Sequence, residues 1–313
     1  MMKINYSKKA IEAFKSISHK FKKIKPKISN TILYACHKDN MLIATWWVGE
    51  GGKNWGDALN PVIINKISGK KIINYEYIYS FKETPVYSVI GSILGRYNSS
   101  NLIVWGSGFI STSSIIKKKV TVCAVRGPLT REKLLKQGID CPEIYGDPAL
   151  LYPLFYNPKK TNKYKLGIIP HFVDQKNSGI SKLEVYKNII IIDILSDTNS
   201  VVDQICSCEM IASSSLHGII AADAYRIPSI WIELSNKIQG DRFKFYDYFS
   251  SVGRELEEPL FISEKSTPEE IYKSFREYTI TIDLLKLLNA CPFIDEEKKH
   301  LLEVRLNNLH SEG

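Results

Sequence analysis

The chain has 313 residues, 44% of them hydrophobic and 24% charged, the composition of an ordinary globular protein of about two domains. It has no apolar run of about 18 residues and no secretory signal pattern, so neither a membrane-spanning helix nor export is expected. Its six cysteines lie mostly in apolar surroundings, which indicates buried thiols rather than disulfides or a metal site. We therefore predict a cytoplasmic protein.

The net charge of +9 is concentrated at one end of the chain. Residues 1–30 hold nine lysines and one acid, a local charge of +8, which leaves +1 for all the remaining residues. A near-neutral body argues against a broad nucleic-acid-binding surface, and a nucleic-acid binder would depend on this terminal segment alone. We predict no nucleic-acid partner.

The same segment has apolar residues spaced three or four apart, as on one side of a helix. They are Ile11, Phe14, Ile17, Phe21 and Ile24. A basic amphipathic helix suits the anionic inner face of a membrane, so we predict peripheral membrane contact through residues 1–30. A solvated tail and a helix packed on the body remain open as alternatives.

From residue 31, short apolar runs alternate with helical patterns. The predicted strands are Met41–Trp47, Lys71–Asn74, Tyr87–Ile90, Leu102–Trp105, Thr121–Val125, Leu166–Ile169, Asn188–Ile194, Met210–Ser213 and Ser229–Glu233. The predicted helices are Ala58–Ile67, Pro128–Gln137, Ser200–Cys206, Leu216–Tyr225, Pro268–Tyr278 and Glu296–Leu309. Short apolar strands followed by helices indicate parallel sheets covered on both faces.

A lysine- and asparagine-rich stretch, Asn157–Lys165, separates two series of strands and is typical of a linker. We predict an α/β fold of two Rossmann-like domains with the active site in the cleft between them. The predicted limits are residues 31–157 and 158–313, preceded by the basic segment 1–30.

In open parallel sheets, ligands bind beyond the carboxyl ends of strands, where loops lead into helix N-termini. Four segments fit such positions: residues 49–61, 105–108, 125–130 and 213–218. In the first, Asp57 lies near a helix N-cap, where an acid either caps the helix or serves a ligand. In the third, Arg126 ends a strand, where its guanidinium either binds a carboxylate or phosphate, or forms an inter-domain salt bridge.

The segment 213–218, Ser-Ser-Ser-Leu-His-Gly, is the strongest candidate. Three hydroxyls, free backbone amides and the imidazole of His217 meet at one helix N-terminus. Histidines of α/β proteins are more often structural, and we expect that of His171, which follows another strand. His217 falls at the ligand-binding edge beside an anion site, so we predict a functional role for it.

Four motifs, in their order and separations, resemble those of the polysaccharide pyruvyltransferase family. They are Asn54–Asp57, Arg126–Thr130, Tyr145–Pro148 and Ser213–Gly218, within a resemblance that runs from about residue 41 to about residue 250. The resemblance implies a GT-B-type arrangement with an N-terminal acceptor side and a C-terminal donor side. It also implies transfer of a pyruvyl unit from phosphoenolpyruvate to a sugar, as a cyclic ketal, in exopolysaccharide or capsule biosynthesis.

Site residues are carried over by the same resemblance. The catalytic group is His217, Arg126, Lys237 and Asp57. The predicted donor-binding residues are Ser213, Ser215, Leu216, Gly218 and Lys244, and the predicted acceptor-binding residues are Asn54, Gly56, Ser107, Gly108 and Asp247. Many family members have arginine where this chain has Ser215, so Lys237, Arg242 or Lys244 would have to supply the missing cation.

In the expected reaction, protonated His217 donates a proton to the methylene carbon of the donor, and an acceptor hydroxyl attacks the neighbouring carbon. Asp57 is the candidate base. We expect no metal and no cofactor besides phosphoenolpyruvate as co-substrate, and the acceptor, lipid-linked or not, stays open. A glycosyltransferase using a nucleotide sugar and a non-catalytic sugar-binding member of the fold remain alternatives.

Overall fold

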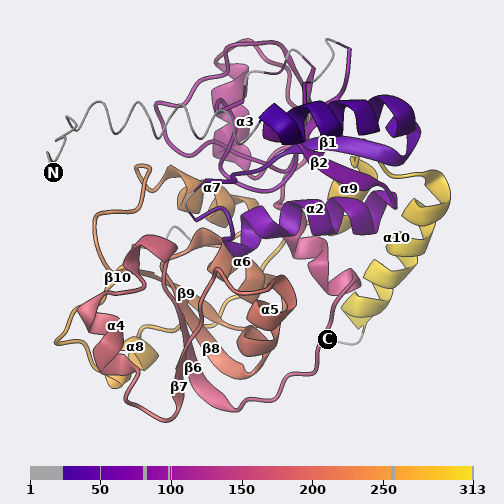
Figure 1. The fold of residues 1–313 in the computed structure, drawn as a ribbon. Helices are drawn as coiled ribbons and strands as arrows, with labels where there is room; N and C mark the ends of the chain where they lie inside the picture. Colours follow the sequence, from indigo (N-terminus) through magenta and orange to yellow (C-terminus); the bar gives the residue numbers. More distant parts are fainter. Residues whose placement is uncertain are drawn as a thin grey trace, which may run out of the picture.

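The computed structural model describes residues 24–49, 51–79, 83–97, 99, 101–254 and 258–311, so most of the predicted amphipathic segment 1–30 lies outside the described residues. Two parallel sheets of five strands each form the framework, one above the other in Figure 1. We call residues 24–156 the N-terminal lobe and residues 164–280 the C-terminal lobe. The α/β class with two parallel sheets is confirmed.

The sheet of the N-terminal lobe has the strand order β2-β1-β3-β4-β5. Its strands are β1 (Met41–Thr45), β2 (Lys71–Asn74), β3 (Val86–Ser88), β4 (Leu102–Trp105) and β5 (Val120–Ala124). Its helices are α2 (Trp55–Ser68) and α3 (Pro128–Leu135), with the 3-10 turns η1 (Lys38–Asn40), η2 (Tyr75–Tyr77) and η3 (Pro148–Leu154). A further helix spans residues 24–37 ahead of β1.

The sheet of the C-terminal lobe has the order β10-β9-β8-β6-β7. Its strands are β6 (Tyr164–Ile169), β7 (Ile189–Ile191), β8 (Cys208–Ser213), β9 (Ser229–Glu233) and β10 (Leu260–Phe261). Its helices are α4 (Ser178–Leu183), α5 (Thr198–Cys206), α6 (Leu216–Ala224), α7 (Phe243–Ser251) and α8 (Pro268–Lys273), with η4 (Phe172–Asp174) after β6.

Strand β1 shows why both faces of the first sheet are covered. Met41 and Ile43 belong to one apolar cluster, and the alternate residues Leu42 and Ala44 belong to another. This alternation is the period of two of an extended strand. The cluster that contains Leu42 and Ala44 continues through α2, α5 and α6 into the C-terminal lobe, so one apolar core joins the two lobes.

The N-terminus of α2 is fixed to the C-terminal lobe by Trp55. Its backbone N–H donates to the Ile194 carbonyl at 2.9 Å, and its indole Nε1 donates to the Thr198 carbonyl at 3.1 Å. Trp55 is fully buried. The loop before α2, which carries the first predicted motif, is therefore held against the other lobe.

Two C-terminal helices, α9 (Leu284–Asn289) and α10 (Glu296–Ser311), lie beside the N-terminal lobe (Figure 1, yellow). Trp105 of β4 donates its indole N–H to the Leu287 carbonyl at 2.8 Å, and its ring meets that of Phe293 with a centroid distance of 5.4 Å. The chain thus crosses between the lobes twice. The limits proposed from the sequence, 31–157 and 158–313, stay a prediction.

Each of the nine predicted strands and six predicted helices overlaps an element of the structure. The predicted helix at Pro268–Tyr278 is shorter, ending at Lys273. Strand β10 and helices α4, α7 and α9 were not predicted. None of the helices in the described part of the chain is long and apolar enough to cross a membrane.

Candidate active site

His217 stands in the first turn of α6, directly beyond the carboxyl end of β8. The close passage of the chain here depends on Gly218, because a Cβ on it would come within 2.3 Å of the Ser213 hydroxyl. The single proton of that hydroxyl is shared between two acceptors, the Ile169 carbonyl at 3.0 Å and the Ser215 carbonyl at 2.9 Å. The result is a rigid strand-to-helix turn that presents one imidazole, only 9% exposed.

The imidazole of His217 lies between two elements of the N-terminal lobe. A Cβ on Gly56, in the first turn of α2, would come within 2.2 Å of His217 Nδ1, so only glycine leaves room for the ring. On the other side, Asp147 Oδ2 is 3.9 Å from His217 Nε2. Both of these atoms are buried and have no hydrogen-bond partner in the described part of the structure. Buried polar atoms without partners are costly and call for an explanation, and here two of them face each other.

A salt bridge would need an ionised Asp147 and a protonated His217, but the pKa of each group is shifted in the direction that favours its neutral form. Burial raises the pKa of Asp147 to about 7, although a hydrogen bond from the Ala149 N–H and the charge of Arg126 act against the rise. Burial lowers the pKa of His217 to about 3, and the nearby positive charges of Lys244 and Arg126 lower it further. Around neutral pH the ligand-free imidazole is therefore neutral, and the Asp147 carboxyl group is partly protonated.

Lys244 is the cation whose charge acts most strongly on His217, whereas Arg126 is the cation that acts on Asp147. Lys244 lies in the first turn of α7, is 9% exposed, and its charge acts on Asp57, His171 and His217. Burial lowers its pKa to about 8, so it stays largely charged at neutral pH. Within the described ranges its ammonium forms no hydrogen bond or ion pair, only a contact 5.4 Å from the Phe245 ring centroid.

Asp57 belongs to the same cluster. Its Oδ1 accepts a hydrogen bond from the Trp47 backbone N–H at 3.1 Å. Burial nevertheless raises the pKa of Asp57 to about 7, against that hydrogen bond and the charges of Arg96 and Lys244. The helix N-cap is Asn54, whose side chain accepts from the Gly56 N–H, so capping alone does not account for Asp57.

Arg126 forms the inter-domain salt bridge that the sequence left open as an alternative. Its Nε and Nη2 contact Asp247 Oδ2 at 3.0 and 2.9 Å, while Nη1 and Nη2 donate to the Ser92 hydroxyl and the Phe109 carbonyl. Asp247 also accepts from the backbone N–H and hydroxyl of Thr130. Arg126 and Asp247 are 1% and 0% exposed, and the ligand-binding roles expected for them stay predictions.

The other predicted residues divide into two groups. Ser213 and Ser107 are enclosed, the latter hydrogen-bonded to the Ser88 hydroxyl at 2.7 Å, and Gly108 packs against the Arg126 guanidinium. Ser215 is the N-cap residue of α6, is 1% exposed, and its side chain makes no capping bond among the described residues. Lys237 is exposed in the loop after β9.

The three cations considered as replacements for an arginine at position 215 differ sharply in the structure. Arg242 is bound to Glu233 at 2.8 Å and to Glu258 at 2.7 Å. Lys237 is exposed, and Lys244 is buried within the cluster. Lys244 is therefore the replacement that the geometry favours.

Two further residues near the cluster, Asp147 and His171, were given no functional role from the sequence. Asp147 stood in a motif that was quoted without a role, because an acid before a proline is fully accounted for as a cap, and it does cap η3 through the Ala149 N–H at 2.9 Å. His171 was expected to be structural, yet burial and Lys244 lower its pKa to about 3. Its position after Pro170 at a strand end was the available signal.

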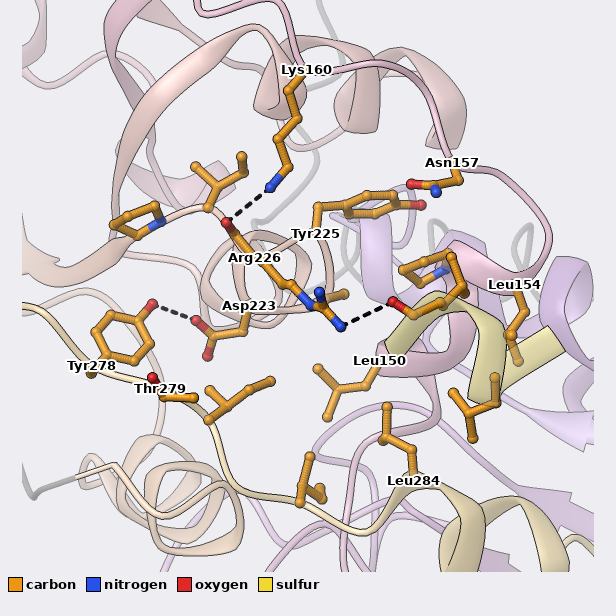
Figure 2. Close-up of a pocket in the computed structure, with 18 residues that line it drawn as sticks. Leu150, Leu154, Asn157, Lys160, Asp223, Tyr225, Arg226, Tyr278, Thr279 and Leu284 are labelled. Atoms are coloured by element: carbon orange, nitrogen blue, oxygen red, sulfur yellow. Dashed lines mark hydrogen bonds between the residues drawn. The ribbon is translucent and has the colours of Figure 1, made fainter. Parts of the chain in front are cut away.

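A separate cavity of about 680 Å³ lies elsewhere, between the C-terminal end of α6, the linker and α10 (Figure 2). Asp223 on its wall accepts from the Tyr278 hydroxyl at 2.6 Å, and Arg226 donates to the Leu309 carbonyl at 3.1 Å. No predicted site residue lines it. Over the described ranges, no three His, Cys, Asp or Glu side chains are grouped so as to hold a metal ion.

Taken together, the α/β fold and a buried acid–imidazole–ammonium cluster near the ends of parallel strands are typical of an enzyme active site. The family model for polysaccharide pyruvyl transferase matches residues 5–236, and the chain belongs to this family. It is 32% identical over 211 residues to the uncharacterized protein L143 of Acanthamoeba polyphaga mimivirus, covering 66% of this chain and 73% of that protein.

It is also 28% identical over 218 residues to the succinoglycan biosynthesis protein ExoV of Rhizobium meliloti (strain 1021). That match covers 66% of this chain and 64% of ExoV. The predicted family is thus confirmed, and pyruvyl transfer to a polysaccharide is the class of activity to which the chain is assigned.

Proposed function

We propose that this protein uses phosphoenolpyruvate to form a pyruvate ketal on a sugar of a cell-surface polysaccharide or its lipid-linked precursor. With that function we infer a GT-B-type arrangement of the two lobes and a cytoplasmic location, the compartment in which phosphoenolpyruvate is made. The observation that carries the proposal is the buried ammonium of Lys244, which makes no hydrogen bond or contact ion pair among the described residues and has only the more distant charge of Asp57 opposite it, beside His217 and the N-terminus of α6.

The donor has two anionic groups on a small carbon frame, so its site needs cations and hydrogen-bond donors that are not already used. Lys244 supplies the charge, and a buried charged partner contributes more to an anion than an exposed one. The first backbone N–H groups of α6 have no partner within the helix and point toward anions. The Ser215 hydroxyl adds a donor at the same end. Arg126, held by Asp247, shapes this site through its positive field.

The proton for the methylene carbon comes, in this proposal, from the Asp147–His217 pair. His217 gives its Nδ1 proton to the methylene carbon while Nε2 takes the carboxyl proton of Asp147, so the imidazole relays a proton without ever being a free imidazolium. The separation of 3.9 Å between Asp147 Oδ2 and His217 Nε2 has to shorten, as catalytic hydrogen bonds commonly do when substrate binds.

Protonation leaves cationic character on the neighbouring carbon, which bonds to the first acceptor hydroxyl oxygen as Asp57 takes that hydroxyl's proton. The bond between this carbon and the phosphate oxygen then breaks, and phosphate leaves with the electron pair. The second hydroxyl bonds to the same carbon, and its proton goes to the phosphate. One proton ends on the new methyl group and one on phosphate, so the reaction is balanced once Asp57 and Asp147 re-equilibrate. A pKa near 7 suits Asp57 for this use as a base.

Donor binding can be measured by titration calorimetry without knowing the acceptor. Phosphoenolpyruvate should bind to the full chain, and Lys244→Ala should weaken binding at least about 30-fold, because a buried charge partner is lost. Lys237→Ala is the matched control, and its effect should be smaller because Lys237 is exposed. Binding of nucleotide sugars but not of phosphoenolpyruvate would instead identify a glycosyltransferase, and binding of neither donor would favour a non-catalytic sugar-binding protein.

Asp147→Asn should lower kcat/KM roughly 100-fold, since the amide cannot supply the proton. In the wild type, kcat/KM should fall as the pH rises through about 7, where Asp147 loses its proton, and the variant should lack this limb. The amide oxygen of the variant can still accept the hydrogen bond that Asp147 receives from the Ala149 N–H, so the fold should persist.

The stability of the Asp147→Asn variant gives a second readout with a defined sign. Because the folded-state pKa of Asp147 is raised, the wild type loses stability as the pH rises from about 4 to about 7. The amide does not titrate, so the variant should melt above the wild type at pH values over about 7, and the gap should close toward about pH 4. A variant that is less stable at every pH would show that Asp147 acts only as a cap.

A further inference from the structure

The helix over residues 24–37 turns its apolar stripe away from the protein. On the inner side, Leu33 and Tyr34 pack against the apolar cluster of the first sheet, and Asn30 donates to the Tyr77 carbonyl at 2.9 Å. Thr31 accepts at 3.0 Å from the Tyr79 N–H. These contacts fix which side of the helix faces the body.

The outer side carries Ile24, Ile28 and Ile32, which are 39%, 50% and 61% exposed. Residues four apart lie one above the other on a helix, so the three isoleucines form one continuous stripe. A surface helix normally shows polar residues to the solvent and apolar ones to the core. Single exposed apolar side chains are ordinary, but a contiguous stripe marks an interaction surface.

The stripe is bordered by positive charge. Lys25 is exposed, and the Lys27 ammonium lies 5.1 Å from the ring centroid of Tyr79, itself 50% exposed. The sequence through residue 30 carries a net charge of +8, against +1 for the rest of the chain. In Figure 1 the helix, the first in dark indigo, lies on the N-terminal lobe far from the sheet of β6 to β10.

The lysines and the isoleucine stripe together indicate which kind of partner this surface binds. A nucleic acid would use the lysines but leave the isoleucines in water, since its phosphates offer them nothing. A second copy docking through this stripe would bring Lys25 and Lys27 of two chains together, which like-charge repulsion opposes. An anionic lipid surface accepts both features at once, with isoleucines entering the acyl boundary and lysines at the headgroups.

We propose that the outward face of the helix over residues 24–37, with Ile24, Ile28 and Ile32 at its centre, docks on an anionic membrane surface. This inference does not depend on the proposed enzymatic function. If both hold, docking concentrates the enzyme where a lipid-linked acceptor lies. The contact is peripheral, with the helix in the plane of the interface.

The test is co-sedimentation of the full chain with vesicles of phosphatidylcholine, with and without phosphatidylserine. Binding should require phosphatidylserine and weaken with salt, since salt screens exposed charges. The triple variant Ile24→Ser, Ile28→Ser, Ile32→Ser should bind at least about tenfold more weakly, because it lacks the three apolar side chains that enter the membrane in this proposal. The matched control is Val185→Ser with Phe261→Ser, which are 76% and 62% exposed elsewhere and should leave binding unchanged.

A second variant separates charge from apolarity. Lys25→Gln with Lys27→Gln should weaken binding about fivefold per lysine and reduce its dependence on salt. Failure of the wild type to bind phosphatidylserine vesicles, or equal binding by the isoleucine variant, overturns the proposal. So does a wild type that is dimeric without vesicles and an isoleucine variant that is monomeric, because the stripe would then be covered by a second copy. None of these results bears on phosphoenolpyruvate binding, which fails or succeeds separately.

Discussion

His217→Ala should lower kcat at least about 100-fold while the affinity for phosphoenolpyruvate changes little. Loss of a general acid or relay typically costs this much. Lys244 and the α6 backbone, which hold the donor in the proposal, remain in place in this variant. The measurement is steady-state kinetics with phosphate release as the readout, at a pH near 7, where Asp147 is still partly protonated and Asp57 is partly ionised.

Two comparisons separate chemistry from structure in this experiment. Added imidazole should restore part of the activity of His217→Ala, because Gly56 and Asp147 leave a ring-sized space between them. His171→Ala, which removes the other histidine near Lys244, should retain most activity. Near-normal turnover of His217→Ala would place the proton donor elsewhere.

Arg126→Ala should lower the free energy of unfolding by about 3 kcal/mol, because breaking a buried pair leaves the other charge without its partner. Asp247 keeps its two bonds from Thr130, which places the loss at the lower end of the usual range. The Phe109 carbonyl and the Ser92 hydroxyl lose their donors as well. Denaturant unfolding measures the change.

The sequence alone predicts a different result for Arg126, namely a higher requirement for the donor. Lys136→Ala is the control, since it breaks a solvent-exposed pair with Glu132 and should change stability little. An Arg126→Ala variant as stable as the wild type, with only the KM for phosphoenolpyruvate raised, would show that the guanidinium binds the donor. If Arg126→Ala instead loses the expected stability and keeps the KM for phosphoenolpyruvate, the guanidinium has the structural role.

Nine of the strands could be predicted because each is a short apolar run, whereas β10, with two residues, gives no such signal. Helix α7 could not be predicted, since its N-cap is Arg242 in a left-handed conformation (φ 65°), which no capping rule anticipates. The placement of α9 could not be predicted either. It depends on long-range contacts such as the bond from Trp105 to the Leu287 carbonyl, and nothing local signals those.

For the candidate site, the local sequence pointed to His217 and Asp57, because each lies at a helix start after a strand, whereas Lys244 was proposed only as one replacement for a cation at position 215. The local sequence could not decide between the two readings of Arg126, as that choice depends on Asp247, which is 121 positions away in the sequence. The role of Asp147 also depends on a contact that is distant in the sequence. Its capping role is visible locally, whereas its second oxygen becomes informative only once His217 is seen to face it.

The most direct test of the account is a structure of the protein with phosphoenolpyruvate bound. The proposed site predicts one anionic group of the donor within hydrogen-bond distance of Lys244 Nζ and the backbone N–H groups that begin α6, with the methylene carbon facing His217. Phosphoenolpyruvate bound away from His217, for example in the cavity beside Asp223, would contradict it.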